Sequence, residues 1–167
     1  MKPAEPPTTK NSLRYQFDTA SKPIRVALAG AIDENADLAG LFDRVVGDTV
    51  INMRDVERVN SMGVHSWVPL VNKVSTRHQL VIEELSYALV QSANAVANMF
   101  GSAVLQSCIA PYYCARCKQN MNVTVSADEV AASPDSVPAK QCARCHSALD
   151  FDELDGYFSF FKARTRK

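Results

Sequence analysis

The most informative part of the sequence reads Val50-Ile-Asn-Met-Arg-Asp-Val-Glu-Arg-Val-Asn60-Ser61-Met62-Gly63-Val64. Residues 49–53 are mostly apolar and are typical of a short buried strand. A loop follows, and apolar residues then recur at the spacing of one helix face, at Val64, Trp67, Val68, Val71 and Val74. The stretch therefore predicts a strand, a loop that ends in a turn, and an amphipathic helix.

Strands and helices alternate on both sides of this stretch. The patterns predict strands at 13–17, 24–30, 49–53, 79–83 and 103–108, and helices at 38–46, 64–74 and 89–100. The turn Ser21-Lys-Pro joins the first two strands in a hairpin. This order predicts an α/β fold with a mostly parallel sheet, an initial hairpin and covering helices.

The composition of the chain changes at Pro111. We expect a flexible tail at 1–11, a main domain at 12–110 and a small C-terminal module at 111–167. Within that module, residues 121–125 favour a ribbon strand, and residues 126–140, rich in Ala, Ser, Pro and Asp, favour a flexible loop.

Four of the five cysteines form two pairs, Cys114-x2-Cys117 and Cys142-x2-Cys145, while Cys108 stands alone. The pairs are separated by 24 residues, which suits a zinc ribbon with four thiolate ligands in a tetrahedron. Four protein ligands leave no open position for a substrate. The spacing therefore predicts a structural Zn²⁺ ion that stabilises the small module.

Other uses of these cysteines stay open. The run Cys142-Ala-Arg-Cys145-His146 also fits covalent haem attachment, which occurs in secreted compartments. His146 could replace one cysteine ligand, and iron or redox chemistry could use the same thiols. The first ten residues show no apolar signal segment, so we expect a cytoplasmic protein with reduced cysteines.

The composition argues against several classes of protein. Eighteen basic residues balance eighteen acidic ones, which disfavours a large nucleic-acid-binding face. No apolar run approaches the ~18 residues of a membrane-spanning helix.

The sequence also offers no set of catalytic residues. The three histidines, His65, His78 and His146, lie outside any recognised catalytic motif, and no glycine-rich phosphate loop is present. The acidic pair Glu83-Glu84 is typical of a solvated strand end. We therefore predict that the protein is not an enzyme.

Residues 12–110 resemble the STAS domain, the fold of the anti-sigma-factor antagonists. Besides the order of elements, the segment Val26-Ala-Leu-Ala-Gly30-Ala-Ile-Asp33 is similar to the family's strand ending in Gly-x-Ile-Asp. Residues 50–64 are similar to its strand, loop and Asp-Ser-Ser/Thr-Gly turn. The resemblance implies that a partner docks on this turn through Asn60, Ser61, Met62, Gly63 and Val64, with Asp33 close by.

The turn departs from the family pattern at two positions. In members that act as switches, a partner kinase phosphorylates the Ser or Thr before the glycine, and Met62 stands there in this chain. The family's aspartate is Asn60. The resemblance therefore implies a docking surface that is not switched by phosphorylation at the usual site. The alternative is that Asn60 or Ser61 only caps the helix and that Asp33 only caps its loop.

The leading prediction is a regulatory protein-interaction module. The resemblance implies a regulatory kinase, a sigma-pathway protein or a lipid-transport ATPase as partner. One alternative is nucleic-acid binding through basic residues of the ribbon and tail, namely Arg116, Lys118, Arg144, Lys162, Arg164, Arg166 and Lys167. The neighbouring acidic residues Asp150, Asp152, Glu153 and Asp155 disfavour it. Sensing of a small ligand is the other alternative.

Overall fold

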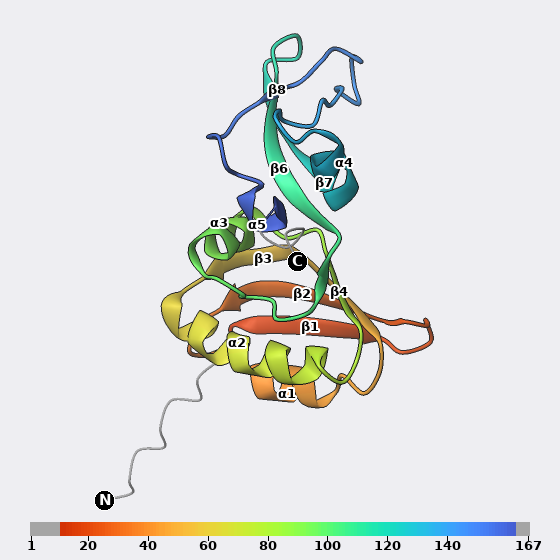
Figure 1. Ribbon diagram of the computed structural model, residues 1–167, viewed down its shortest axis with the longest axis vertical. Coiled ribbons are helices and arrows are strands. Elements are labelled where there is room, and N and C mark those ends of the chain that lie inside the picture. The colour runs from red at the N-terminus through yellow and green to blue at the C-terminus, as the bar shows by residue number, and fades with distance from the viewer. Residues whose placement is uncertain (1–10, 163–167) are drawn as a thin grey trace, which may run out of the picture.

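The computed structural model describes residues 11–162 (Figure 1). A five-stranded sheet has the order β1-β2-β3-β4-β5, in which only the β1–β2 pair is antiparallel. This confirms the predicted α/β fold with a mostly parallel sheet and an initial hairpin. Of the predicted tail at 1–11, residues 1–10 lie outside the described part. The strands are β1 (Leu13–Asp18), β2 (Ile24–Ile32), β3 (Thr49–Val59), β4 (Leu80–Glu83) and β5 (Val104–Leu105).

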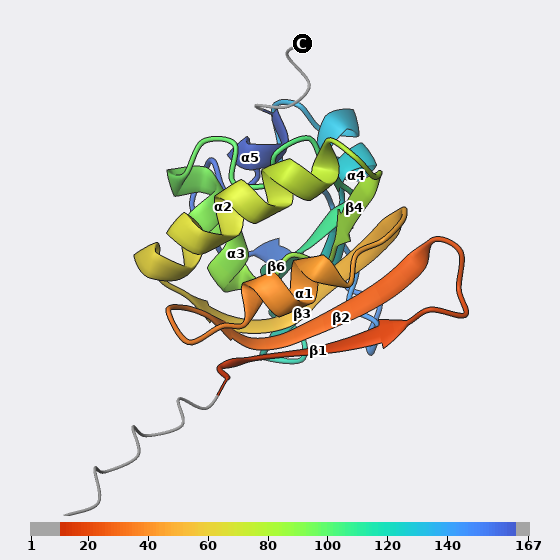
Figure 2. The same ribbon diagram turned by 90° about the horizontal axis from the view of Figure 1, so that it is seen from below.

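Helices α1 (Leu38–Asp43) and α2 (Ser61–Ser75) lie side by side over one face of this sheet, and α3 (Tyr87–Ala95) packs on β3 (Figure 2). Trp67 of α2 is fully buried at the centre of this layer. Its ring contacts Phe42 at 5.1 Å and Phe100 at 6.3 Å between centroids. The indole Nε1–H donates to the Met99 carbonyl oxygen at 3.1 Å, so its polar atom is satisfied.

Strand β3 is longer than predicted. The expected strand ended at residue 53, whereas β3 continues to Val59, immediately before the turn at Asn60. Val56 is buried, while Arg54 and Asp55 before it are exposed. Register shifts against β2 interrupt the alternation of sides, and a strict period of two therefore does not detect the second half of the strand.

Two helices are shorter than predicted. Helix α1 ends at Asp43, where the Arg44 N–H bonds to the carbonyl oxygens of Leu41 and Phe42, and Val46 is 75% exposed. Helix α3 ends at Ala95. Met99 and Phe100 are buried in the turns that follow, so their burial does not require the helix to continue.

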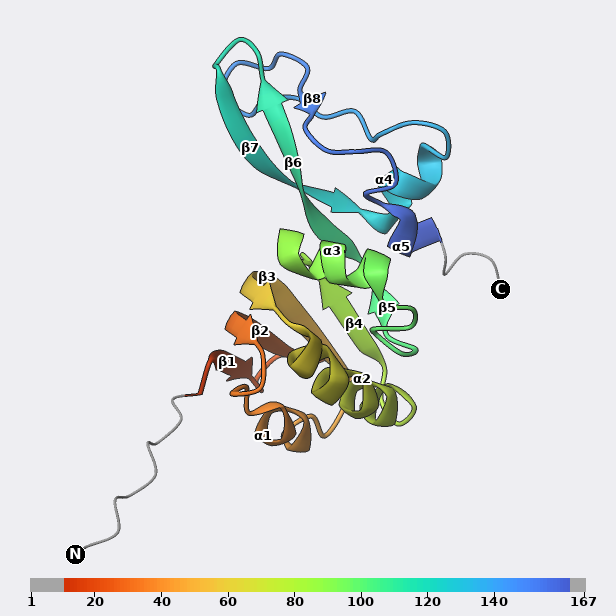
Figure 3. The same cartoon turned by 90° about the vertical axis from the view of Figure 1, so that its left-hand side faces the viewer.

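The predicted strand at 103–108 is two strands, because β5 ends at Leu105 and β6 (Ser107–Cys114) starts a second sheet. This sheet has the order β7-β6-β8, with β7 (Gln119–Ser126) and β8 (Asp150–Phe151) both antiparallel to β6. A bridge between Leu85 and Cys108 connects β6 to the end of β4. Strand β6 therefore runs through the expected boundary at 110/111 (Figure 3).

The segment 126–140 is not a loop throughout, as the composition suggested. It contains helix α4 (Ala127–Ala132), which begins with a capping box. The Ser126 hydroxyl accepts from the Glu129 N–H, and the Glu129 carboxylate accepts from the Ser126 N–H. Lys140 pairs with Glu129 at 2.5 Å and donates to the Thr124 carbonyl oxygen, which holds the end of the segment against β7.

The aromatic C-terminal segment packs between the two sheets. Tyr157, Phe158, Phe160 and Phe161 are buried, and helix α5 (Ser159–Lys162) lies against α3. Asn94 of α3 donates to the Tyr157 carbonyl oxygen at 2.9 Å and accepts from the Phe160 N–H at 3.0 Å. The end of the described chain is therefore attached to the first sheet's helices.

Candidate functional site

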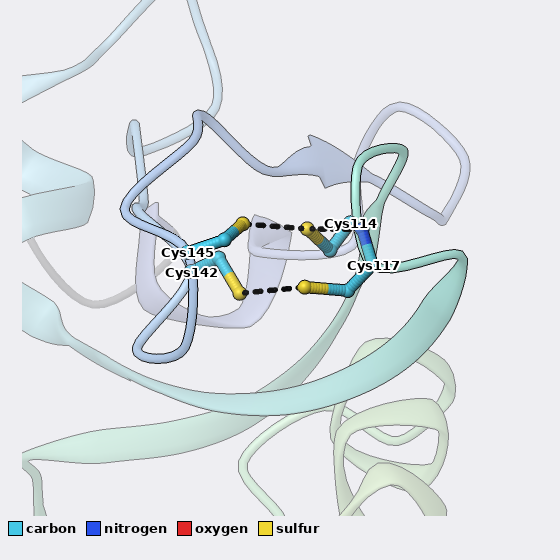
Figure 4. Close-up of side chains that lie close together, drawn as sticks. All are labelled: Cys114, Cys117, Cys142 and Cys145. Carbon is cyan, nitrogen blue, oxygen red and sulfur yellow. Dashed lines mark hydrogen bonds between the residues drawn. The ribbon is translucent and has the colours of Figure 1, made fainter.

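The two cysteine pairs meet at the far end of the second sheet (Figure 4). Cys114 is the last residue of β6, and the turn before β7 brings the Cys117 N–H to 3.4 Å from the Cys114 Sγ. The second pair lies in a turn closed by a bridge between Gln141 and Ala148. Each pair thus sits on a hairpin-like turn whose two sulfurs point to the same side.

The four sulfurs are spaced for a tetrahedral ion. The Sγ atoms of Cys114 and Cys145 are 3.5 Å apart, those of Cys117 and Cys142 are 3.9 Å apart, and all four lie within 4.8 Å of one another. A tetrahedron with metal–sulfur bonds of about 2.3 Å has sulfur–sulfur edges of about 3.8 Å. The cluster therefore has the size that a thiolate-bound metal ion needs.

The residue after each pair adopts a left-handed backbone, with φ of 53° at Lys118 and 59° at His146. This conformation reverses the chain after the second sulfur. His146 donates its N–H to the Cys142 carbonyl oxygen at 2.9 Å, and its exposed side chain is not among the grouped ligands. The four cysteines form the group by themselves within the described part of the chain.

The surroundings of the thiols favour ionisation at the second pair. Backbone N–H groups of Arg144 and Cys145 lower the pKa of Cys142, and hydrogen bonds from Ser147 lower the pKa of Cys145 to about 6. The neighbouring thiols raise the pKa of Cys117 to about 12. A cation would replace these sulfur–sulfur contacts and bind the thiolates.

The start of α2 forms the second candidate site. Asn60 is the N-cap, and its Oδ1 accepts from the Gly63 N–H at 2.8 Å. Its Nδ2 donates to the Glu34 carboxylate at 2.7 Å. Ser61 and Met62 point to solvent, with Met62 57% exposed. A side chain at Gly63 would overlap the Ile32 carbonyl oxygen, which explains why this position needs glycine.

Asp33 lies close to this turn but is not part of its exposed surface. Its carboxylate is buried, pairs with Arg58 at 2.8 Å, and accepts from the Ser12 hydroxyl and from the Asn35 N–H. The hydrogen bonds from Ser12 and Arg58 lower the pKa of Asp33. Asp33 therefore ties the residue before β1 to β3 and to its own loop.

The acidic pair Glu83-Glu84 belongs to a network that the sequence did not reveal. Glu83 pairs with Arg25 at 2.6 Å, Glu84 pairs with Arg54 at 2.7 Å, and both carboxylates accept from the Asn52 amide. Thr124 of β7 also donates to Glu84 at 3.0 Å. The network joins the middle of β3 and the end of β4 to the second sheet.

The surface also has a hollow that no motif in the sequence predicted. It has a volume of about 340 Å³ and lies between the C-terminal parts of α1 and α2. Its lining includes the apolar residues Phe42 and Val45 and the basic residues Lys73, Arg77 and His78. These residues are far apart in sequence, so only the packing of the two helices brings them together.

Comparison with protein-family models, with curated proteins and with solved structures returned no match for this chain. Among the described residues, none of the helices is long and apolar enough to cross a membrane.

Proposed function

We propose that this protein is a non-enzymatic regulatory module with a STAS-like domain that docks a protein partner through the start of α2. The observation that carries the proposal is the exposed pair Ser61 and Met62 on a turn fixed by Asn60 and Gly63. A methionine adapts its shape to an apolar partner, and a rigid turn presents it at low entropic cost. The partner is a regulatory kinase, a sigma-pathway protein or an ATPase subunit of the kind that STAS-like domains bind.

The surface acts without phosphorylation at the usual position, because Met62 has no hydroxyl group. The Asn60 amide stands where the family has aspartate, and its two polar atoms bind Gly63 and Glu34 within the chain. The contact is therefore constitutive.

We propose Zn²⁺ as the ion at the four cysteines, in a structural role within a module at 111–167. The soft thiolate set and the tetrahedral spacing support zinc, and four protein ligands leave no position for a substrate. Metal analysis of the purified protein checks this, with one zinc per chain expected. An equivalent of iron in its place would contradict it.

The docking surface is tested by capturing partners from native extract with wild type, Ser61→Asp and Ser66→Asp. Both serines are exposed on α2, so Ser66→Asp is a matched control for added charge. Aspartate at the first turn of a helix is favourable to the helix, so Ser61→Asp should remain folded. We expect a partner that Ser61→Asp loses and Ser66→Asp keeps. Equal capture by all three proteins would place docking elsewhere.

Nucleic-acid binding is the second candidate function. Arg116, Lys118 and Arg144 are all exposed around the two cysteine turns. Binding to DNA or RNA at low salt that falls steeply as salt is added, and that is lost in Arg116→Glu, would support this function. No binding at low salt would remove it.

A further inference from the structure

Strand β1 forms one edge of the first sheet, with no further described strand paired beyond it (Figure 2). It has six residues, whereas the strand at the opposite edge, β5, has two. An edge strand of this length presents unpaired backbone groups that can pair with another strand. What it can pair with depends on which groups face outward and which side chains flank them.

The outward groups of β1 follow from its pairing with β2. The Ala31 N–H donates to the Ser12 carbonyl oxygen at 2.9 Å. Because backbone groups alternate in direction along a strand, Arg14 and Gln16 also direct theirs to β2. The backbone groups of Tyr15 and Phe17 consequently point away from the sheet. The Leu13 N–H, which also points outward, is taken up by the Asn11 side chain at 3.1 Å.

The side chains of β1 alternate between two faces. Leu13 is buried and Tyr15 and Phe17 are half-buried on the core face, while Arg14, Gln16 and Asp18 are exposed on the open face. Arg14 is in none of the ion pairs found within residues 11–162. The open face of the edge thus carries a positive charge, a neutral centre and a negative charge in that order.

We propose that β1 pairs with β1 of a second copy of this chain, antiparallel and centred on Gln16. In this register the outward groups of Tyr15 bond to those of the partner's Phe17, and the reverse. Arg14 faces the partner's Asp18 on the open face, twice by symmetry, and the aromatic rings face each other on the core face. Centring on Tyr15 instead places Arg14 opposite Gln16 and pairs no charges. A register shifted by one residue puts polar side chains on the core face.

The partner is a second copy because the pattern is complementary to itself. Reading β1 in the opposite direction exchanges the positions of Arg14 and Asp18 and those of Tyr15 and Phe17. Arg44 packs on the aromatic rings of the same edge. Its guanidinium lies 4.2 Å from the Phe17 ring centroid and 5.8 Å from the Tyr15 ring centroid. The paired edges would bury these half-exposed rings. The inference does not depend on the proposed function of α2.

Disulfide trapping tests the register in the full chain. At the centre, the two Gln16 residues form a non-hydrogen-bonded pair with a Cα separation of about 4.5 Å, which a disulfide can bridge. Gln16→Cys, oxidised by oxidised glutathione, should give a covalent dimer linked through position 16 by peptide mapping. Arg77→Cys, at an exposed position outside β1, is the matched control and should give none. Equal trapping of both variants, or of neither, would overturn the proposal.

Charge exchange tests the contact without a covalent link. Sedimentation equilibrium of wild type at rising concentration should show a mass tending to twice that of the single chain. Arg14→Asp should abolish this association, and Arg14→Asp with Asp18→Arg should restore it. Arg77→Asp makes the same charge change at an exposed position just after α2 and should leave the association intact. Circular dichroism checks that each variant is folded. A wild type that stays a single chain at every concentration, or a folded double variant without restoration, would contradict self-pairing.

Discussion

Asn60 shows how one side chain can serve both a helix and a loop. It accepts the hydrogen bond of the Gly63 N–H and donates to Glu34 across the turn. Serine can keep the first of these bonds, and alanine can keep neither. At this position the requirement for a helix cap and the requirement for a rigid turn, on which the proposed docking surface depends, coincide.

Asn60→Ala should lower the free energy of unfolding by about 1 kcal/mol, because the first turn of α2 loses its cap. Urea unfolding monitored by circular dichroism measures the loss. Asn60→Ser is the matched control and should recover most of the stability. An equal loss in both variants would mean that the Glu34 contact matters more than the cap.

Asp33 predicts how stability depends on pH. Hydrogen bonds from Ser12 and Arg58 hold its folded pKa below the ordinary value of 3.8, so the folded state binds its proton less readily than the unfolded state. The stabilisation is therefore complete above pH 3.8 and is lost as the pH falls toward the folded pKa. Asp33→Asn should be less stable than wild type at pH 7, and urea titrations should show the gap narrowing below pH 4. A gap that is constant with pH would contradict this.

At the scale of elements, the contact between α3 and α5 joins the end of the described residues to the first sheet's helical layer. It depends on Asn94, whose amide makes two hydrogen bonds to the backbone of the C-terminal segment. The Tyr157 hydroxyl adds a third link by donating to the Ile109 carbonyl oxygen of β6 at 2.7 Å. Burial raises the pKa of this hydroxyl well above its usual range, so it stays protonated and remains a donor.

Asn94→Ala should loosen α5 without unfolding the sheets. Two hydrogen bonds of roughly 1 kcal/mol each would be lost, so amide exchange in residues 157–161 should speed up at least several-fold. Hydrogen exchange followed by mass spectrometry measures this. Lys73→Ala, at an exposed position on α2, is the control and should leave the exchange unchanged. Unchanged exchange in Asn94→Ala would show that the buried aromatic rings alone hold the segment.

At the scale of the whole molecule, the path of β6 and the packing beside it connect the two sheets. Strand β6 runs between them without a break, and Phe151, Tyr157 and Phe158 stack into one aromatic group beside it. The single tryptophan, Trp67, lies in the helical layer of the first sheet and reports on that part alone. The four-cysteine group lies at the end of β6 that is farther from the first sheet.

Cys114→Ser should release the metal and unfold the module at 111–167, while the first sheet keeps its structure. Metal content should fall and the near-ultraviolet signal of the tyrosines should weaken, because metal binding stabilises so small a module. Trp67 fluorescence should stay that of a buried indole. Cys108→Ala is the control, since burial keeps Cys108 a thiol, with its pKa raised to about 12, away from the four ligands. A red shift of Trp67 in Cys114→Ser would show that the two parts are one cooperative unit.

Local patterns of the sequence determined a large part of this structure. The order of strands and helices in the first sheet and the cap at Asn60 follow from short-range periodicity and hydrogen-bond chemistry, which neighbouring residues express directly. The spacing of the cysteines similarly predicted their meeting, because each short pair forms its own turn. The sequence also contained the Ser126–Glu129 capping box, whose signal the composition of 126–140 concealed.

Tertiary structure alone decided the rest. The full length of β3 depends on the register shifts against β2. The end of α1 depends on the backbone hydrogen bonds of Arg44. The burial of Asp33, the network around Glu83 and Glu84, and the path of β6 through the expected boundary all depend on residues far apart in the chain. Such contacts leave no local period, because the free energy that selects them comes from packing and from charges that meet only after the chain has folded.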